Sequence, residues 1–172
     1  MLELIKAPDP RLRVKTKPVK KTSASLLQIL KEMVKLTKTF QDPEGVGLAS
    51  TQIGLNERFF VAKDNENFIM VINPKIISSS KQTKTYFEGC LSTPNIWGEV
   101  KRHLRINVSY LDEKGITKTI ILKGLLAHIF QHEIDHLNGI LFQDRVLAQK
   151  GSFYKFTGKD KAGSDIYEEI TL

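Results

Sequence analysis

The sequence contains a single cysteine, Cys90, so no disulfide bond can form within the chain. It also lacks any run of about twenty apolar residues, the length that a helix needs to cross a membrane. The first residues hold no long apolar stretch of the kind found in secretory signals, and Asp9 and the nearby prolines argue against a transit peptide. Together these absences lead us to expect a cytoplasmic protein with no membrane partner.

What the sequence does contain is enough apolar material for one hydrophobic core. Of its 172 residues, 41% are hydrophobic, which suits a single domain of ordinary size. We expect this domain to span residues 1–146. Residues 147–172 are polar and show no sustained periodicity, so we expect a loose tail that packs on the domain or extends from it, with a short strand at 166–170.

The net charge of +7 is concentrated near the N-terminus. Residues 1–40 hold ten lysines and arginines against three acidic residues, whereas the rest of the chain holds sixteen of each kind. A basic surface of this type can attract a polyanion such as RNA. No aromatic interleaving and no nucleic-acid-binding motif accompanies the charge, so we predict no specific nucleic-acid partner, and an ordinary solvated surface remains the alternative.

The hydrophobic pattern predicts a mixture of helices and short strands. Apolar residues recur at helical spacing over 24–40, behind a serine at position 23 or 25 that can cap a helix. Small residues fill 41–56, which indicates a loop. Residues 112–115 predict a hairpin turn between two strands. The strand-like segments are 58–62, 68–72, 83–87, 104–111 and 117–122.

A second predicted helix carries the sequence His132-Glu133-Ile134-Asp135-His136. Because residues i and i+4 lie on one helix face, His132 and His136 can bind one cation, and Glu133 can accept a proton from a water at that cation. The alternative is an exposed face where these polar residues meet water, but the surrounding apolar residues predict a buried helix. We therefore expect an α+β fold with curved antiparallel β-sheets around a buried metal-binding helix, plus the N-terminal helix.

A catalytic metal site usually has three protein ligands, so the two histidines need a third. Asp135 is adjacent to His136 and points to a different part of the helix, while His128 would extend a straight row that converges poorly on one ion. Cys90 follows a predicted strand in a turn-like segment, and a thiolate there would be a strong ligand. The candidates considered for the third ligand are Cys90, Glu88, Asp135, His103 and His128, and this reasoning favours Cys90.

Three segments resemble the motifs of the peptide deformylase family and occur in the same order. They are 45–52 (Gly-Val-Gly-Leu-Ala-Ser-Thr-Gln), 88–92 (Glu-Gly-Cys-Leu-Ser) and 131–136 (Gln-His-Glu-Ile-Asp-His). Residues 9–13 and 18–19 are similar to that family as well, and the resemblance covers roughly residues 5–145. The middle motif, with Cys-Leu-Ser, resembles the active bacterial and organellar enzymes.

The resemblance implies a metal-dependent hydrolase that removes the N-terminal formyl group from formylmethionine of newly synthesised proteins and releases formate. It implies Fe(2+), with Zn(2+), Ni(2+) or Co(2+) as substitutes, held by Cys90, His132 and His136. Glu133 would act as general base and acid while metal-bound hydroxide attacks the formyl carbon. The expected partners are nascent formyl-Met polypeptides, and the basic N-terminal region could draw the enzyme to the ribosome.

The resemblance also assigns residues around the metal. The side-chain amide of Gln52 and the backbone N–H of Leu91 would stabilise the oxyanion, although an ordinary turn-capping amide is the alternative for Gln52. Backbone near four residues would pair with the extended substrate: Gly45, Val46, Gly47 and Gly89. The expected walls of the methionine pocket are Leu125, Ile129, Val46 and Phe87, with Ile96 and Trp97 at the rim.

Two residues depart from the family pattern. His128 stands on the helix where the family usually has an apolar residue, so the pocket is expected to be more polar. Ser50 replaces the usual second alanine of the first motif, a mild change. Neither departure removes a predicted ligand or the predicted base.

Two other functions fit parts of the sequence. A zinc peptidase shares His-Glu-x-x-His but usually adds a downstream ligand, for which Glu168 and Glu169 are the candidates. Such a peptidase would keep its metal when Cys90 is replaced by serine. A basic module that docks on RNA through residues 1–40 would show salt-dependent binding and no hydrolysis.

Overall fold

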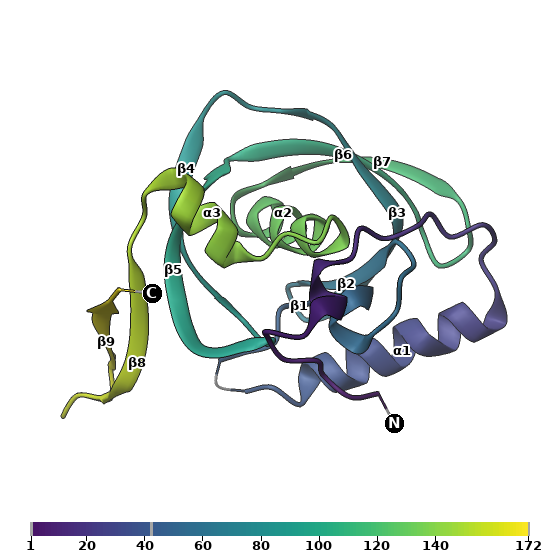
Figure 1. Ribbon diagram of the computed structural model, residues 1–172. Helices are drawn as coiled ribbons and strands as arrows, with labels where there is room; N and C mark the ends of the chain where they lie inside the picture. The colour runs from purple at the N-terminus through teal and green to yellow at the C-terminus, as the bar shows by residue number, and fades with distance from the viewer. Residues whose placement is uncertain (1, 42, 172) are drawn as a thin grey trace.

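One helix lies inside a ring of strands formed by two antiparallel β-sheets. The structure, a computed structural model, describes residues 2–41 and 43–171. In Figure 1 the helix α2 (Gly124–Leu137) is seen nearly end-on, with strands curving around it. One sheet has the strand order β1-β2-β3-β6-β7 and the other has the order β4-β5-β8-β9. The predicted α+β fold, with curved sheets around a buried helix and a further helix near the N-terminus, is confirmed.

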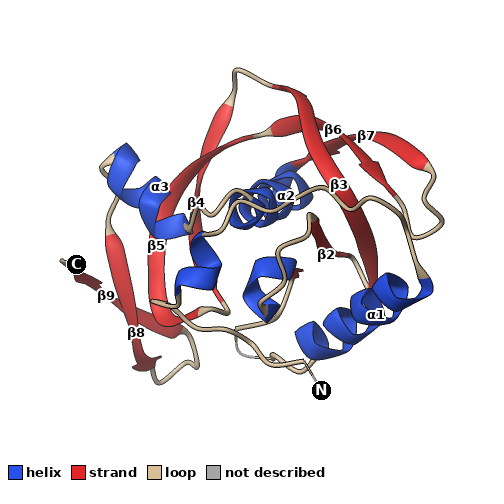
Figure 2. Ribbon diagram, turned by 45° about the vertical axis from the view of Figure 1, so that its right-hand side comes forward, coloured by secondary structure: helices blue, strands red, loops and turns tan. Residues whose placement is uncertain are grey.

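The elements appear along the chain as follows, and Figure 2 colours them by type. They are η1 (Pro10–Arg13), α1 (Ala24–Lys38), β1 (Gly47–Ala49), η2 (Ser50–Ile53), β2 (Phe59–Asp64), β3 (Asn67–Ser79), β4 (Thr83–Cys90), β5 (Thr93–His103), β6 (Arg105–Leu111), β7 (Thr117–Lys123), α2, α3 (Phe142–Gln149), β8 (Phe153–Lys159) and β9 (Asp165–Ile170). In the described part of the chain, no helix combines the length and the apolar character that spanning a membrane requires.

Helix α1 forms where the sequence predicts it. The side chain of Ser23 caps the helix by accepting a hydrogen bond from the backbone N–H of Leu26 at 3.2 Å. Leu30 and Met33 are fully buried on the inner side of the helix and belong to a cluster with residues of β1, β2 and β3. The apolar stripe therefore fixes α1 against one face of the five-stranded sheet.

Strand β2 separates two parts of the core and fixes the position of α2. Successive side chains of a strand point to opposite faces. Phe59 and Val61 pack in the cluster that includes α1, whereas Phe60 packs in the cluster that includes α2. The ring of Phe60 meets that of Phe130 on α2 edge to face, with centroids 5.0 Å apart. Burial of both faces explains why this strand lacks an alternating pattern of polar residues.

Helix α2 ends at the Asn138-Gly139 pair. Gly139 adopts a φ of 73°, in the left-handed region, and its N–H donates to the carbonyl of His136 at 3.0 Å. A Cβ atom at this position would overlap the backbone carbonyl of Arg13. The helix thus stops just after the last histidine, against the N-terminal segment.

The segment 41–56 and the strand β5 differ from the expectation. The predicted loop contains the short strand β1 and the 3₁₀ helix η2, although Asp42 lies outside the described residues. The sequence does not predict strand β5, because Pro94 and Gly98 interrupt the run of strand-forming residues. Gly98 is needed there, since a Cβ atom would lie 2.6 Å from the side chain of Val146.

The C-terminal segment has more regular structure than the loose tail expected from the sequence. It continues from α3 into the hairpin of β8 and β9, and β8 pairs with β5 (Figure 1). Phe153 of β8 is buried against Val100, Phe142 and Val146. The predicted strand at 166–170 is present within β9. The division into a domain at 1–146 and a tail at 147–172 stays a prediction, and Leu172 lies outside the described residues.

Candidate metal centre

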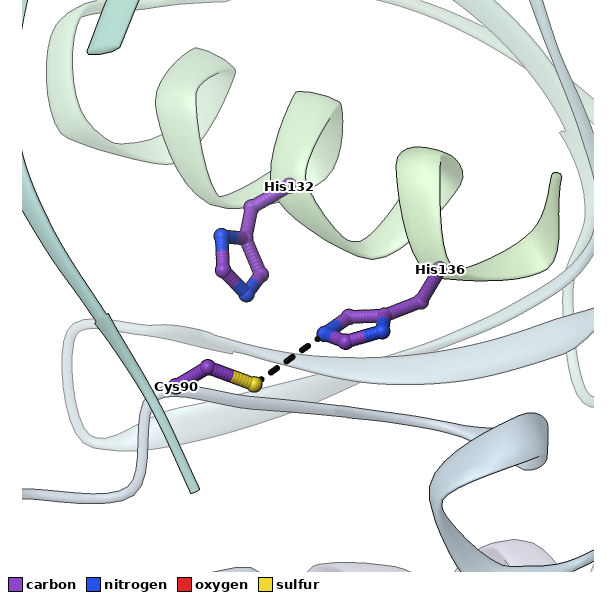
Figure 3. Close-up of side chains that lie close together, drawn as sticks. All are labelled: Cys90, His132 and His136. Carbon is purple, nitrogen blue, oxygen red and sulfur yellow. Dashed lines mark hydrogen bonds between the residues drawn. The ribbon is translucent and has the colours of Figure 1, made fainter. Parts of the chain in front are cut away.

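Cys90, His132 and His136 converge at one point between β4 and α2 (Figure 3). Their ligand atoms all lie within 4.8 Å of one another, and the Sγ atom of Cys90 is 3.2 Å from Nε2 of His136. One helical turn separates the two histidines, so both rings project from the same side of α2. In the part of the chain that the structure describes, this is the one cluster of three or more such side chains with ligand geometry.

The donor atoms and their surroundings fit a divalent metal ion. A thiolate and two imidazoles suit iron, zinc, nickel and cobalt. Nδ1 of His132 hydrogen-bonds Glu88 at 2.9 Å, which orients the ring and leaves Nε2 for the metal. Burial alone would raise the pKa of the Cys90 thiol, but His136 and His132 outweigh it and hold that pKa well below its usual value. The cysteine is therefore prepared to bind as a thiolate.

Glu88 holds the metal-binding residue His132 through a hydrogen bond with its Nδ1 atom. Its side chain is buried and accepts hydrogen bonds from Arg102 Nε at 2.8 Å and Nη2 at 3.0 Å, and from His128 at 2.7 Å. Burial alone would raise the pKa of Glu88, but the bonds from His128, His132 and Arg102 lower it well below the usual range. Glu88 is therefore an ionised carboxylate that holds His132 in place.

The same arginine ties Glu88 to the metal-binding helix. Arg102 also donates to Asp135 at 2.5 Å, and Asp135 accepts two further bonds from Arg145 at 2.9 and 2.6 Å. Burial alone would raise the pKa of Asp135, but Arg145 and Arg102 lower it. A continuous chain of charges thus runs from the surface to His132. The pattern of the sequence does not single out Arg102, because Pro94 and Gly98 conceal the strand that carries it.

The other residues considered as a third ligand lie outside the cluster. Glu88 and Asp135 take part in the charge chain. His128 bonds Glu88, and its ring stacks on Tyr86 with centroids 4.2 Å apart. His103 is exposed, with Nδ1 2.7 Å from the carbonyl oxygen of Ser80.

Glu133 lies beside the two histidines and is positioned to accept a proton. Its side chain is buried, and Oε2 has no hydrogen-bond partner among the described residues. Burial is the main cause that raises its pKa to about 7, with the Cys90 and Glu88 charges acting in the same direction and the histidines against it. The carboxylate packs on Gly47 of β1 so closely that any Cβ atom at that position would overlap it.

Gln52 and Leu91 lie where the predicted oxyanion donors should be. The Gln52 side chain is 2% exposed, and its Nε2 lies 3.5 Å from Cys90 Sγ and 3.1 Å from Ser92 Oγ. Its Oε1 accepts the N–H of Ala49 at 2.8 Å, which fixes the amide orientation. Leu91 follows Cys90 and lines the same cavity. These positions agree with the predicted roles, which stay predictions.

A cavity of about 200 Å³ opens beside the three ligands. Gly45 does not line it, and instead lies buried against the carbonyl of Thr37. Pro43 and Glu44 do line it, and in the sequence only their position just before the first motif indicates a place in the cavity wall. The predicted substrate-binding or wall residues that line it are Val46, Gly47, Phe87, Gly89, Trp97, Leu125 and Ile129.

The downstream acids that a zinc peptidase would need are not at this centre. Glu168 and Glu169 lie on β9 and are exposed. Glu169 accepts a hydrogen bond from Ser152 at 2.6 Å. Neither acid belongs to the cluster of Cys90 and the two histidines. The geometry therefore disfavours the peptidase alternative.

Comparison with known proteins identifies a family with this arrangement. The family model described as polypeptide deformylase matches residues 1–151. The peptide deformylase of Thermotoga petrophila is 42% identical over 142 residues, which cover 83% of this chain and 85% of that protein. The crystal structure of the Thermotoga maritima peptide deformylase aligns with a TM-score of 0.79 at 40% identity, over 84% of this chain and 97% of that one.

A class I type b peptide deformylase from Acinetobacter baumannii, solved with Met-Ala-Ser bound, is also similar. It aligns with a TM-score of 0.77 at 32% identity, over 84% of this chain and 98% of its own. The similarity therefore includes a relative whose structure holds a peptide.

Replacing Arg102 by leucine should destabilise the metal-free protein by about 3–5 kcal/mol, because it leaves the Glu88 and Asp135 carboxylates buried without their shared partner. Urea unfolding after metal chelation measures this free energy. The matched control is Arg105→Leu, an exposed arginine, for which a change within about 0.5 kcal/mol is expected. Equal effects of the two substitutions would contradict the anchoring role of Arg102.

Proposed function

The chain belongs to the polypeptide deformylase family, and on that premise we propose how its own residues remove the N-terminal formyl group from newly made polypeptides. The observation that carries the mechanism is the convergence of Cys90, His132 and His136 beside Glu133. The reaction is the hydrolysis of an amide, which yields formate and a free amino terminus. A bound divalent ion would supply a water of lowered pKa and an electrophile for the formyl oxygen.

Glu133 is the general base and then the general acid of this mechanism. With a pKa of about 7, its carboxylate can accept the proton of the attacking water and release it again at neutral pH. The second proton transfer goes to the leaving amine, which would otherwise depart as an unstable anion. The unpartnered Oε2 atom and the place of Glu133 in the cavity wall support this role.

Gln52 and Leu91 are the donors for the developing oxyanion. The Gln52 amide is held by Ala49 and directed at Cys90, so it needs little reorganisation when negative charge appears. We assign the second donor to the backbone N–H of Leu91. This assignment rests on its place next to Cys90 and on the cavity wall.

The substrate backbone binds between two sheet edges. β1 is an edge strand of one sheet and β4 is an edge strand of the other, and both border the cavity. An extended peptide can add to such an edge through main-chain hydrogen bonds. We assign these bonds to backbone around Val46, Gly47 and Gly89, with Gly45 acting indirectly because it does not line the cavity.

The side chain of the formylated methionine enters the cavity beside α2. Ile129 is buried in its wall, while Leu125 is exposed at the mouth. Phe87 and Val46 add apolar surface. His128 makes this wall more polar, but its Nε2 is bonded to Glu88, so the ring is held as part of the anchor of the centre.

We propose Fe(2+) as the resident metal, with Zn(2+), Ni(2+) or Co(2+) as substitutes. The Cys-His-His donor set accepts all four ions. Residues 1–146 would form the catalytic unit, since every proposed site residue lies within them. The enzyme would act where formylated chains are synthesised, in the cytoplasm by our expectation.

Glu133→Gln should lower kcat for formate release from formyl-Met-Ala by about 10²–10⁴-fold, because the amide cannot take up a proton. Metal content should stay the same, as the ligands are intact. Glu168→Gln, a substitution of an exposed acid, is the control and should change neither quantity. Full activity of the Glu133 variant would rule out the assigned base, whereas binding without formate release by the unsubstituted protein would rule out the activity.

The iron-loaded enzyme should lose activity in air faster than the zinc- or nickel-loaded enzyme, because a reactive Fe(2+) ion promotes oxidation of the Cys90 thiolate. Metal analysis of anaerobically purified protein and the activity half-life under air measure this. Identical half-lives for the three metals would remove the argument for iron.

The basic N-terminal region is proposed to draw the enzyme to ribosomes. All ten of its lysines and arginines are exposed. Replacing Lys15, Lys17, Lys20 and Lys21 by glutamine should reduce co-sedimentation with ribosomes at low salt and weaken its salt dependence. Unchanged co-sedimentation would end this proposal. The control replaces four exposed lysines elsewhere, namely Lys81, Lys84, Lys101 and Lys114.

A further inference from the structure

A second cavity lies next to the cavity of the metal centre and continues toward the C-terminal hairpin. Its volume is about 300 Å³. The two cavities share Pro43, Glu44 and Trp97 in their walls. Beyond these shared residues, the second cavity is bordered by Phe156 and Tyr167 of the hairpin. The cavity of the metal centre and the cavity beside β8 and β9 therefore adjoin at these three residues.

Four aromatic rings line the two cavities, and a fifth, that of Tyr154, packs against one of them. The rings of Phe87 and Trp97 are stacked, with centroids 5.4 Å apart and planes inclined by 6°. Tyr167 meets both edge to face, at 4.8 Å from Phe87 and 5.6 Å from Trp97. Phe156 lies 5.8 Å from Tyr167, and Tyr154 lies 5.2 Å from Phe87. We call these five residues the aromatic platform.

The aromatic platform is a surface feature and not part of the core. None of its rings belongs to the hydrophobic clusters formed by the described residues. Phe87 is 41% exposed, and the other four rings are partly exposed. Aromatic rings that pack on one another and still face solvent are well suited to contact a further apolar group.

The acidic residues at the second cavity, Glu44 and Asp165, already form ion pairs. The aromatic rings are therefore the groups left to bind a ligand there. Glu44 forms an ion pair with Lys63, and Asp165 forms one with Lys159 at 2.6 Å. A basic ligand group would have to compete with these lysines. An apolar side chain would instead gain contact with Trp97 without breaking an ion pair.

We propose that Trp97, Phe156 and Tyr167 form a subsite for an apolar or aromatic side chain of the nascent polypeptide, downstream of the formylated methionine. This rests on the proposed function, because that function places the formyl end of the substrate at the metal centre. Because the second cavity adjoins the first at Pro43, Glu44 and Trp97, the residues that follow the methionine lie within reach of the hairpin. The hairpin lies beyond residue 151, where the match to the family model ends.

The test compares kcat/KM for formyl-Met-Ala with that for longer formylated peptides that carry phenylalanine or aspartate at one of the next positions. At one position, phenylalanine should raise kcat/KM about tenfold over aspartate. In Tyr167→Ala this preference should fall to nearly none. Ile166→Ala removes the neighbouring side chain of β9, which points to the opposite face, and should keep the full preference.

A binding measurement tests the subsite in the unsubstituted protein. Trp97 is the sole tryptophan, so its fluorescence reports on peptide contact. An unformylated peptide with phenylalanine at the preferred position should change the emission at lower concentration than its aspartate counterpart. Equal affinities, together with equal kcat/KM at every position, would overturn the subsite while leaving deformylation intact. Failure to release formate even from formyl-Met-Ala would overturn the proposed function instead.

Discussion

The paired guanidinium of Arg102 is the contact on which the metal centre depends. It lies on β5 and bonds both Glu88 of β4 and Asp135 of α2. The strand that ends in Cys90 is thereby fastened to the helix that carries the two histidines. A buried charge is stable only when its partners are complete, and here each carboxylate is satisfied by several donors. The spacing of the ligands is thus set by electrostatics as well as by apolar packing.

Glycines at two positions keep backbone close to the reacting groups. At Gly47 a side chain would occupy the space of the Glu133 carboxylate, and at Gly89 it would lie 2.9 Å from the Trp97 ring. Both residues belong to strands at a sheet edge beside the cavity. The absence of side chains therefore lets α2 approach β1 and lets the Trp97 ring approach the backbone of β4.

The sequence allowed good prediction of features that depend on local pattern. The apolar stripe of α1 and the spacing of His132 and His136 each reflect the geometry of a single helix. The ion pairs of Arg102 could not be predicted from the sequence, because Arg102 and Asp135 lie 33 positions apart and meet only through packing of β5 on α2. β5 itself was hidden by Pro94 and Gly98, which are tolerated because neighbouring elements pack around them. Cys90, 46 positions from His136, could be proposed from chemistry, but only the fold brings it into place.

The charged strand β9 has a consequence for contacts between molecules. Among the strands of the described residues, β9 is an edge strand that pairs with β8. Asp165, Glu168 and Glu169 line this strand, and like charges would meet if two copies added edge to edge. Repulsion between these carboxylates thus opposes self-association of two copies through β9.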